Sequence, residues 1–342
     1  MDITKGKYVI KKAMSPFFGG LYQGLGQIIV LHRIIPELKK QRLRNTGIEI
    51  TEQHLEEVIV FFKKRNYDFI SLDELPAYLQ GKHKNKFVIF TLDDGYVDNL
   101  THAYPIFKKH QVPFTIYVTT NFPDRKAVLW WYLLEDLLLK NNKITFEFQG
   151  NHMSHSLQSF SEKEKAFNDL RHLIKDQQEE QQAILIDTLF TKNHMPLYEK
   201  VEDLALSWDQ ILQLNADPLV TIAAHTVTHP SFKAISDAEI LNEVEQSVEI
   251  LESKLDAKIE HFAYPYGSPV EVGQREVELL ARTRIKTATT GRNGNIMAEH
   301  HDHLLVLPRL YVGPLTTEKY LANFINGRNL FVAGAKQRVV TL

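Results

Sequence analysis

The sequence predicts an α/β fold in which about seven or eight strands form either a closed barrel or an open, doubly wound sheet. Short apolar runs alternate with segments of helical period along most of the 342 residues. Successive strands are separated by helices, which is typical of β-α-β units and of a parallel sheet. A chain of this length can also bury a large core.

The first half of the chain predicts a β-α-β order. The run GQIIVLHRI (26–34) is expected to form a strand that ends near His32. Residues 51–66 have their apolar side chains at helical spacing, and 97–110 repeat that pattern. Further strands are expected over 67–72, 86–92 and 113–120.

The alternation resumes in the second half. A strand over 219–225 precedes a helix whose start is marked by the capping-box residues Ser236 and Glu239. A second helix is expected near 272–283. The remaining strands are expected over 259–265, 285–290 and 304–308.

Residues 121–207 interrupt this rhythm. They begin with a strongly apolar run, VLWWYLLEDLLLK, and continue with a short strand pattern and polar helical segments. Ordinary connections run to about six residues. We therefore interpret 121–207 as a partly helical insertion within a single catalytic domain spanning 1–342. Trp130 and Trp131 resemble a sugar-stacking platform, but their helical spacing beside leucines favours a place in the core.

The composition excludes several classes of protein. Hydrophobic residues make up 44% and charged residues 24%, which is ordinary for a globular chain, and a net charge of -2 gives no electrostatic case for nucleic acid binding. The absence of Cys rules out disulfides and thiolate ligands. Any metal must therefore be held by His and carboxylate side chains.

The chain is expected to be cytoplasmic, because no apolar run reaches about 18 residues and the N-terminus lacks a signal-peptide pattern. Two interpretations of this basic N-terminus remain open. It either packs on its own domain, which we favour, or associates peripherally with the inner face of a membrane. The residues concerned are Lys5, Lys7, Lys11, Lys12, Phe17, Phe18, Leu21 and Tyr22.

Two adjacent carboxylates follow a predicted buried strand in the run FVIFTLDDG. Asp93 and Asp94 form either a simple Asp-Asp-Gly turn or part of a site. A second motif, HTVTH, places His225 and His229 directly after another strand. The carboxyl ends of parallel strands gather on one face, where the two motifs can meet.

One Asp and two His form a facial set of metal ligands with positions left open for water and substrate. A cation beside Asp94 reduces the cost of keeping both carboxylates ionised. Asp93 is then available as a base that accepts a proton from water.

These motifs, TLDDG (91–95) and HTVTH (225–229), together with YPYG (264–267), resemble the polysaccharide deacetylase family, the NodB-homology carbohydrate esterases. The resemblance covers about residues 26–312 outside the insertion. It implies a distorted (β/α) barrel of about seven strands and hydrolysis of acetyl groups on sugars with a divalent metal, usually zinc. Carried over, Asp93 is the catalytic base, and the metal ligands are Asp94, His225 and His229. Tyr266 contributes a backbone N–H to the oxyanion.

The chain departs from the family pattern at two places. Ala263 and Tyr264 stand where the family has an Arg before Pro-Tyr-Gly, and LPRLYVG has Arg309 where a general-acid His is usual. We expect Arg309 to pair with Asp93. His32 is the first candidate for the acid. The equally weighted alternative is that His32 is a core histidine with its hydrogen bonds satisfied and no role in the reaction. His301 and His303 are weaker candidates.

The function expected from the sequence is metal-dependent removal of an N-acetyl group from an amino sugar in a glycan or in a lipid- or nucleotide-linked glycan precursor. An acetylated amino sugar is the expected partner. The alternatives are an amidase acting on a small non-sugar substrate and a saccharide-binding pseudoenzyme. We expect the insertion to cover the strand ends and to shape the sugar site, because it lies between the two motifs in the sequence.

Overall fold

A computed structural model describes residues 14–15, 19–38, 42–333 and 337–342. The basic N-terminal residues named above, together with Phe17 and Phe18, lie outside the described residues. None of the helices in the described part of the chain is long and apolar enough to cross a membrane.

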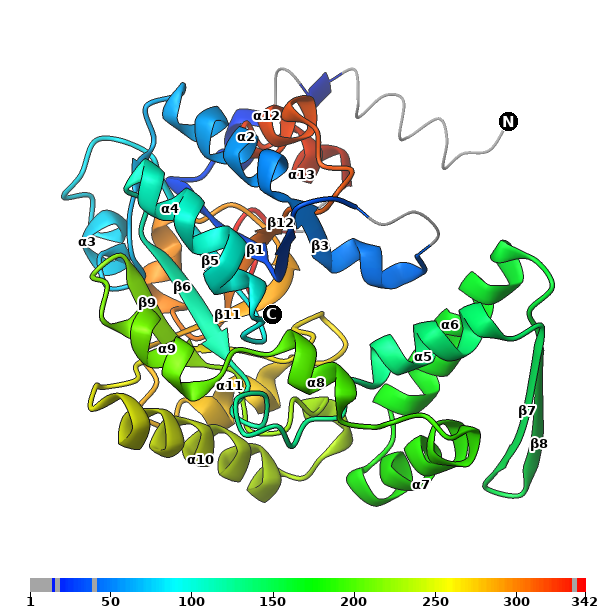
Figure 1. Ribbon diagram of the computed structural model, residues 1–342. Coiled ribbons are helices and arrows are strands. Elements are labelled where there is room, and N and C mark those ends of the chain that lie inside the picture. The colour runs from blue at the N-terminus through cyan, green and yellow to red at the C-terminus, as the bar shows by residue number, and fades with distance from the viewer. Residues whose placement is uncertain (1–13, 16–18, 39–41, 334–336) are drawn as a thin grey trace.

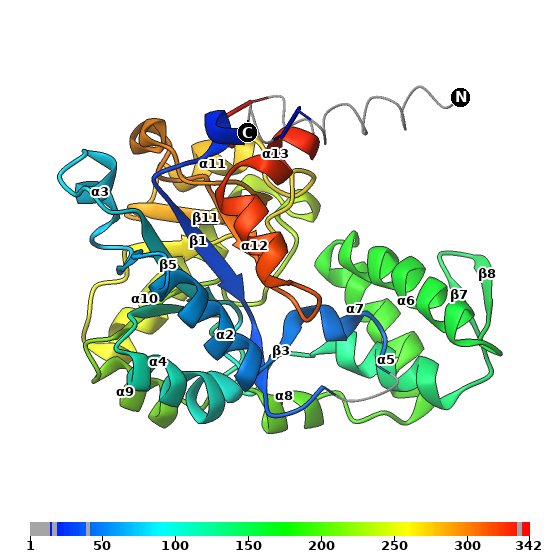
Figure 2. The ribbon, with the colours of Figure 1, turned by 90° about the horizontal axis from the view of Figure 1, so that it is seen from above.

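In the described residues, seven parallel strands close into a barrel (Figures 1 and 2). Closure is made by β1 and β5, which pair in register from Gly26 with Phe87 to Leu31 with Leu92. The predicted distorted (β/α) barrel of about seven strands is confirmed. In order around the barrel, the strands are β1 (Gly26–Leu31), β12 (Leu307–Tyr311), β11 (Thr287–Asn293), β10 (His261–Ala263), β9 (Val220–Ala224), β6 (Phe114–Val118) and β5 (Phe87–Leu92).

The barrel forms because its strands are apolar enough to be buried on both faces. Every residue of β1, β5 and β6 is buried. One face of these strands contacts a core completed by the apolar stripes of surrounding helices. These helices are α2 (Glu52–Lys63), α4 (Tyr104–His110), α9 (Trp208–Asn215), α10 (Asp237–Leu255), α11 (Gln274–Leu280) and α12 (Glu318–Ile325). The short helix α13 (Arg328–Ala333) adds Leu330 to the same core, and α3 (Leu75–Leu79) packs in a second cluster with residues of β1 and β5.

Three expected elements differ from the sequence interpretation. The strand expected over 304–308 lies three residues further along, as β12. The strand expected over 67–72 is reduced to β4 (Asp68–Phe69), because Glu74 accepts hydrogen bonds from the backbone and hydroxyl of Ser71 and starts a turn there. The helix expected over 97–110 begins with a π-helical turn, Asn99–Ala103, before α4. Pro105 lies in the first turn of α4 and lacks the N–H that an α-helical bond at this junction needs.

The insertion leaves the barrel after β6 and returns to it at α9. It has a hydrophobic core of its own, formed by residues including Leu134, Phe167 and Leu189. In Figure 1 it projects beside the barrel as a group of helices and a long hairpin. Its elements are α5 (Trp130–Lys140), β7 (Lys143–Phe148), β8 (Asn151–Ser156), α6 (Phe160–Lys175), α7 (Glu179–Leu189) and α8 (Glu199–Leu204).

Candidate active site

One cavity of about 410 Å³ collects seven of the predicted site residues at the carboxyl end of the barrel. The loops after β1, β5, β9 and β10 contribute most of them, and β12 contributes one from within the strand. The carboxyl ends of parallel strands meet at one end of a barrel, which brings residues distant in sequence together. The residues are His32, Asp93, Asp94, His225, His229, Tyr266 and Arg309.

The loops that carry these residues contain backbone conformations that non-glycine residues rarely adopt. Asp94, Thr226, His229 and Tyr266 have φ values of 77°, 69°, 63° and 60°. Each such residue costs about 1–3 kcal/mol and persists only where its surroundings enforce it. Three of them, Asp94, His229 and Tyr266, line this cavity, and Thr226 follows His225 directly, which indicates that the fold maintains strain here to direct particular side chains inward.

Asp94, His225 and His229 form a group that fits a metal ion. The Oδ1 atom of Asp94 lies 3.4 Å from Nε2 of His225 and 3.5 Å from Nε2 of His229. Ligand atoms held about 2.1 Å from a zinc ion at tetrahedral angles lie about 3.4 Å apart, so the spacing suits a shared ion. Asp94 Oδ1 is also buried without a hydrogen-bond partner among the described residues, as expected of a ligand atom.

The protonation of these ligands is set by their neighbours. His225 Nδ1 lies 2.7 Å from the carbonyl oxygen of Ala263, so the proton on Nδ1 leaves the Nε2 lone pair directed at the shared centre. Burial would raise the pKa of Asp94, but its interaction with His225 holds it well below its usual range. Burial lowers the pKa of His229 to about 4, which keeps this ring neutral and able to bind metal.

Glu243 on α10 holds the loop between the two histidines. Its carboxylate accepts hydrogen bonds from the backbone N–H groups of Val227 and Thr228 at 2.8 and 2.9 Å, and from the Thr228 hydroxyl at 2.8 Å. The sequence interpretation missed this residue. The sequence did contain a signal for it. Glu243 lies one helical turn after Ile240 and next to Val244, both of which face the core, so its carboxylate is close to the buried side of the helix.

Replacing Glu243 with Ala is expected to lower the zinc affinity of the protein by about 10–100-fold, the usual effect of losing a group that orients metal ligands. The loop would lose three hydrogen bonds while all three ligand side chains remain. Competition with a zinc chelator measures the change. Glu245→Ala is the matched control, because Glu245 is exposed on the same helix. Equal zinc affinity in the two variants would contradict the role given to Glu243.

Asp93 is held by Arg309 in a buried, two-pronged ion pair. Nη1 and Nη2 of Arg309 each lie 2.7 Å from a carboxylate oxygen of Asp93, and the two side chains are 3% and 5% exposed. Arg309 also donates to the carbonyl oxygen of Thr290 at 2.9 Å. Burial would raise the pKa of Asp93, but Arg309 lowers it overall, so the carboxylate is kept ionised. The predicted pairing of Arg309 with Asp93 is confirmed.

His32 lies at the cavity wall beside this pair. Its Nε2 is 4.0 Å from Oδ2 of Asp93, and its side chain is 22% exposed, so it is accessible rather than enclosed in the core. The side-chain amide of Asn99 donates to the His32 carbonyl oxygen at 2.8 Å and fixes the backbone there. His301 and His303 are exposed on a different loop and do not line the cavity.

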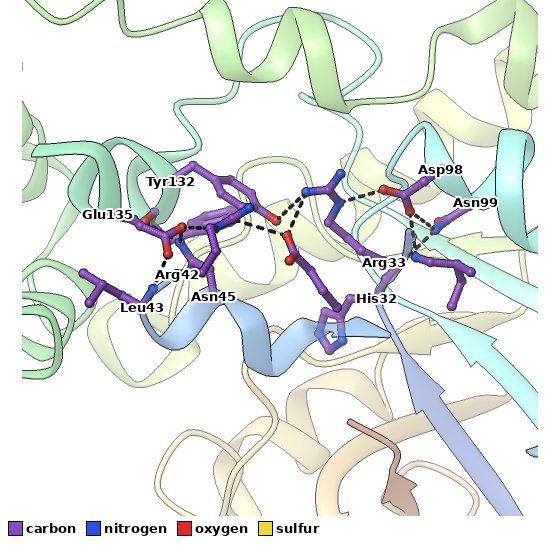
Figure 3. A network of polar contacts seen from close by, with 12 residues as sticks. His32, Arg33, Arg42, Leu43, Asn45, Asp98, Asn99, Tyr132 and Glu135 are labelled. Carbon is purple, nitrogen blue, oxygen red and sulfur yellow. Dashed lines mark hydrogen bonds and ion pairs between the residues drawn. The ribbon is translucent and has the colours of Figure 1, made fainter. Parts of the chain in front are cut away.

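A buried polar network connects the backbone next to His32 with the insertion (Figure 3). Arg33 donates to Asp98 at 2.7 Å, to Glu49 at 3.1 Å and to the hydroxyl of Tyr132 on α5 at 3.3 Å. Arg33 and Glu49 lie in the paired strands β2 (Arg33–Ile35) and β3 (Glu49–Thr51). The network therefore fixes α5 of the insertion to the barrel end that carries His32.

Arg42 extends the network along α5. It contacts Glu49 at 3.2 Å and Glu135 at 2.9 Å. Asn45 joins it by donating to Glu135 at 3.0 Å and to the backbone carbonyl of Trp131 at 2.8 Å. Charged groups buried in this way are stable only when every member finds partners.

Tyr266 lines the cavity beside His229. Among the described residues, no acceptor takes its backbone N–H. The Tyr266 ring packs against His229 at 4.8 Å between centroids. Lys175 of α6 lies 5.4 Å from the same ring and forms a buried ion pair with Glu271, which lies on the loop after Tyr266.

The insertion supplies one wall of the cavity, so the prediction that it covers the strand ends is confirmed. Trp130, Trp131, Phe167 and Arg171 line the cavity, and the Trp131 ring lies 6.0 Å from that of His229. The core interpretation holds for Trp130, which is 5% exposed within the insertion core. Trp131 also packs against hydrophobic clusters of the protein, but it is only partly buried and its ring faces that of His229 in the cavity.

Fold and site together define an α/β-barrel protein with a carboxylate–histidine group at the carboxyl ends of its strands. A profile of the polysaccharide deacetylase family matches residues 80–283, more than half of the chain. The chain therefore belongs to the polysaccharide deacetylase family. No curated protein sequence gives a significant match.

Solved structures support the same fold. The Streptococcus pyogenes deacetylase PplD in complex with acetate is 17% identical with a TM-score of 0.57, over 87% of this chain and 97% of that one. A de-N-acetylase from Aggregatibacter actinomycetemcomitans is 14% identical with a TM-score of 0.58, over 87% and 99%. IcaB from Ammonifex degensii is 17% identical with a TM-score of 0.54, over 88% and 97%.

Proposed function

We propose that the protein removes an N-acetyl group from an amino sugar, in a glycan or a lipid- or nucleotide-linked glycan precursor, with zinc as its cofactor. The observation that carries this proposal is the buried pair of Asp93 and Arg309 beside Asp94, His225 and His229. Family membership supports the sugar substrate. The aromatic walls of the cavity offer surfaces for the apolar faces of sugar rings.

Each residue has a role in this reaction. Zinc held by Asp94, His225 and His229 would supply the positive charge that polarises the acetyl carbonyl and acidifies water. Asp93, kept ionised and oriented by Arg309, accepts a proton from the attacking water. The N–H of Tyr266 donates to the oxygen on which negative charge develops. His32 donates a proton to the departing amine.

Arg309 also bears on the pseudoenzyme alternative. That alternative rested on the absence of Arg before Pro265 and of the usual acid His. Arg309 provides a guanidinium to Asp93 from a different strand. His32 occupies the same cavity as the base. A module that only binds sugars has no need of this arrangement.

Acetate release from chitin oligosaccharides and from UDP-N-acetylglucosamine tests the proposal. Zinc-loaded protein is expected to release acetate, to lose this activity after treatment with a chelator, and to regain it with zinc. No release from either substrate class, or release that chelation does not affect, would contradict the proposal.

His32 has a specific expected signature. Replacing it with Gln is expected to slow hydrolysis of an acetamido sugar by about 10²-fold, because an amine leaves poorly unless it is protonated. Hydrolysis of 4-nitrophenyl acetate should be nearly unchanged, since nitrophenolate leaves without a proton. Zinc content is measured on the same preparation. Equal losses on both substrates would show that His32 supports the structure of the site rather than acting as the acid.

A further inference from the structure

A second cavity adjoins the candidate active site at the junction of the barrel and the insertion. Its volume is about 650 Å³, and it shares Gly47 and Tyr311 with the cavity that holds the reacting groups. One of its walls is α6 of the insertion, and another is the loop between β12 and α12 (Figure 2). A group attached to a sugar in the active site can therefore extend past Gly47 into this second cavity.

Gly47 keeps the passage between the two cavities open. It lies in the short helical turn η2 (Arg44–Ile48). A Cβ atom added to Gly47 would meet only the hydroxyl oxygen of Tyr311 within 4 Å, at 3.5 Å, which is an ordinary contact. A larger side chain thus has room at this position, beside the other residue that the cavities share, and would narrow the passage.

Exposed apolar side chains line the second cavity. Leu315, on the loop between β12 and α12, is 91% exposed. Tyr311 and Tyr320 are 38% and 40% exposed and line the same cavity. A single exposed leucine needs no explanation. Three apolar side chains around one cavity that opens into an active site form a surface suited to an apolar ligand.

The polar side chains of the second cavity offer little to a polar ligand. Arg42 is the only cation among its described lining residues, and this cation is already paired with Glu49 and Glu135. The Thr316 hydroxyl accepts a hydrogen bond from a backbone N–H of its own loop at 3.0 Å. Glu164 is exposed and adds a negative charge. A nucleotide needs cations for its phosphates, and a second sugar needs partners for its hydroxyl groups, so a hydrocarbon chain fits this lining better.

We propose that the second cavity holds a hydrocarbon chain joined to the amino sugar, so that the protein binds a glycolipid in preference to a neutral polysaccharide or a nucleotide sugar. This inference rests on the proposed function and names its substrate class. The sugar lies beside Asp93, and the chain passes Gly47. Beyond it the chain packs on Leu315, Tyr311 and Tyr320. Burial of apolar surface supplies the affinity, since hydrocarbon contacts need no matched polar groups.

Calorimetric binding to the zinc-loaded protein tests this proposal without requiring turnover. The probes are methyl, butyl and octyl β-glucosaminide, together with a glucosamine disaccharide and UDP-glucosamine for the other two occupants. A fully buried methylene contributes about fourfold in affinity, and part of the chain is buried, so the octyl probe should bind about ten- to a hundredfold more tightly than the methyl probe. Tighter binding of the disaccharide or of UDP-glucosamine than of the octyl probe overturns the proposal.

Two variants locate the effect. Leu315→Ser removes an apolar contact and should lower the octyl-to-methyl affinity ratio by about tenfold. Gly47→Leu narrows the passage and should lower the ratio as well. Leu212→Ser is the matched control, because Leu212 is 43% exposed on α9 and lines neither cavity, and it should keep the full ratio. A ratio that survives in either variant, or that is close to one in the wild type, overturns the proposal, as does a lack of binding by every probe.

The acetate-release assay separates this proposal from the proposed function. Its substrates are methyl and octyl N-acetyl-β-glucosaminide. If both release acetate with equal kcat/KM and the octyl probe shows no gain in binding, the deacetylase assignment stands and the glycolipid fails. If neither releases acetate but the gain in binding depends on Leu315, the binding site stands and the reaction fails.

Discussion

Replacing Asp93 with Asn is expected to lower the rate of deacetylation by about 10²–10⁴-fold, the usual contribution of general acid–base catalysis, while zinc stays bound. Asn has nearly the same volume as Asp but cannot accept a proton as a carboxylate does. Added zinc should not restore the rate. The metal content and the turnover of one preparation are the two measurements.

Asp94→Asn is the matched comparison. Position 94 then lacks a charged ligand while His225 and His229 remain, so the zinc affinity should fall and activity should fall with it. Excess zinc is expected to recover part of the activity. Loss of zinc from Asp93→Asn and its retention by Asp94→Asn would reverse the two assignments. Full activity in both variants would mean that Asp93 and Asp94 only form an Asp-Asp-Gly turn and have no role in catalysis or metal binding.

Replacing Arg309 with Met is expected to lower both turnover and stability. The variant leaves the Asp93 carboxylate buried without its cation, and breaking a buried ion pair costs about 3–5 kcal/mol in the free energy of unfolding. Burial then acts on Asp93 unopposed by Arg309 and raises the pKa of the base. The base is ionised only at higher pH, so the acidic limb of the pH–rate profile should move upward.

Urea denaturation, zinc content and the pH–rate profile measure these effects separately. Arg309→Lys is the control, because it keeps the charge and loses the two-pronged geometry, and it should be intermediate. Turnover unchanged in Arg309→Met at neutral pH would mean that Arg309 only stabilises the fold.

The strands of the barrel were predictable from the sequence because they leave a local signal, whereas their closure into a barrel rather than an open sheet was implied only by the family resemblance. A strand buried on both faces must be apolar throughout, and the uninterrupted burial of β5 reflects the run FVIFTL. The site residues were predictable for a related reason. Polar residues that directly follow such a strand lie at the carboxyl end of the barrel, whatever their distance in sequence.

The polar network around Arg33 left no comparable signal. Arg33 and Tyr132 are separated by 99 positions, and neither belongs to a pattern that indicates the other. The orientation of Trp131 was equally hidden, because an apolar helix with buried residues on several sides does not reveal which one faces a cavity. Contacts between the insertion and the barrel depend on how two separately formed cores dock, and local periodicity does not encode this.

The double attachment of the insertion has a consequence for exchanging parts between related proteins. One attachment joins Arg42 and Glu135 at α5, and the other joins Lys175 and Glu271 at α6. Each pair has one member in the insertion and one outside it. In a chimaera that receives a foreign insertion, Glu271 would therefore lose its buried cation, and Arg42 would lose Glu135 and keep only Glu49. Transfer of this segment is expected to succeed only when residues 42 and 271 are transferred with it.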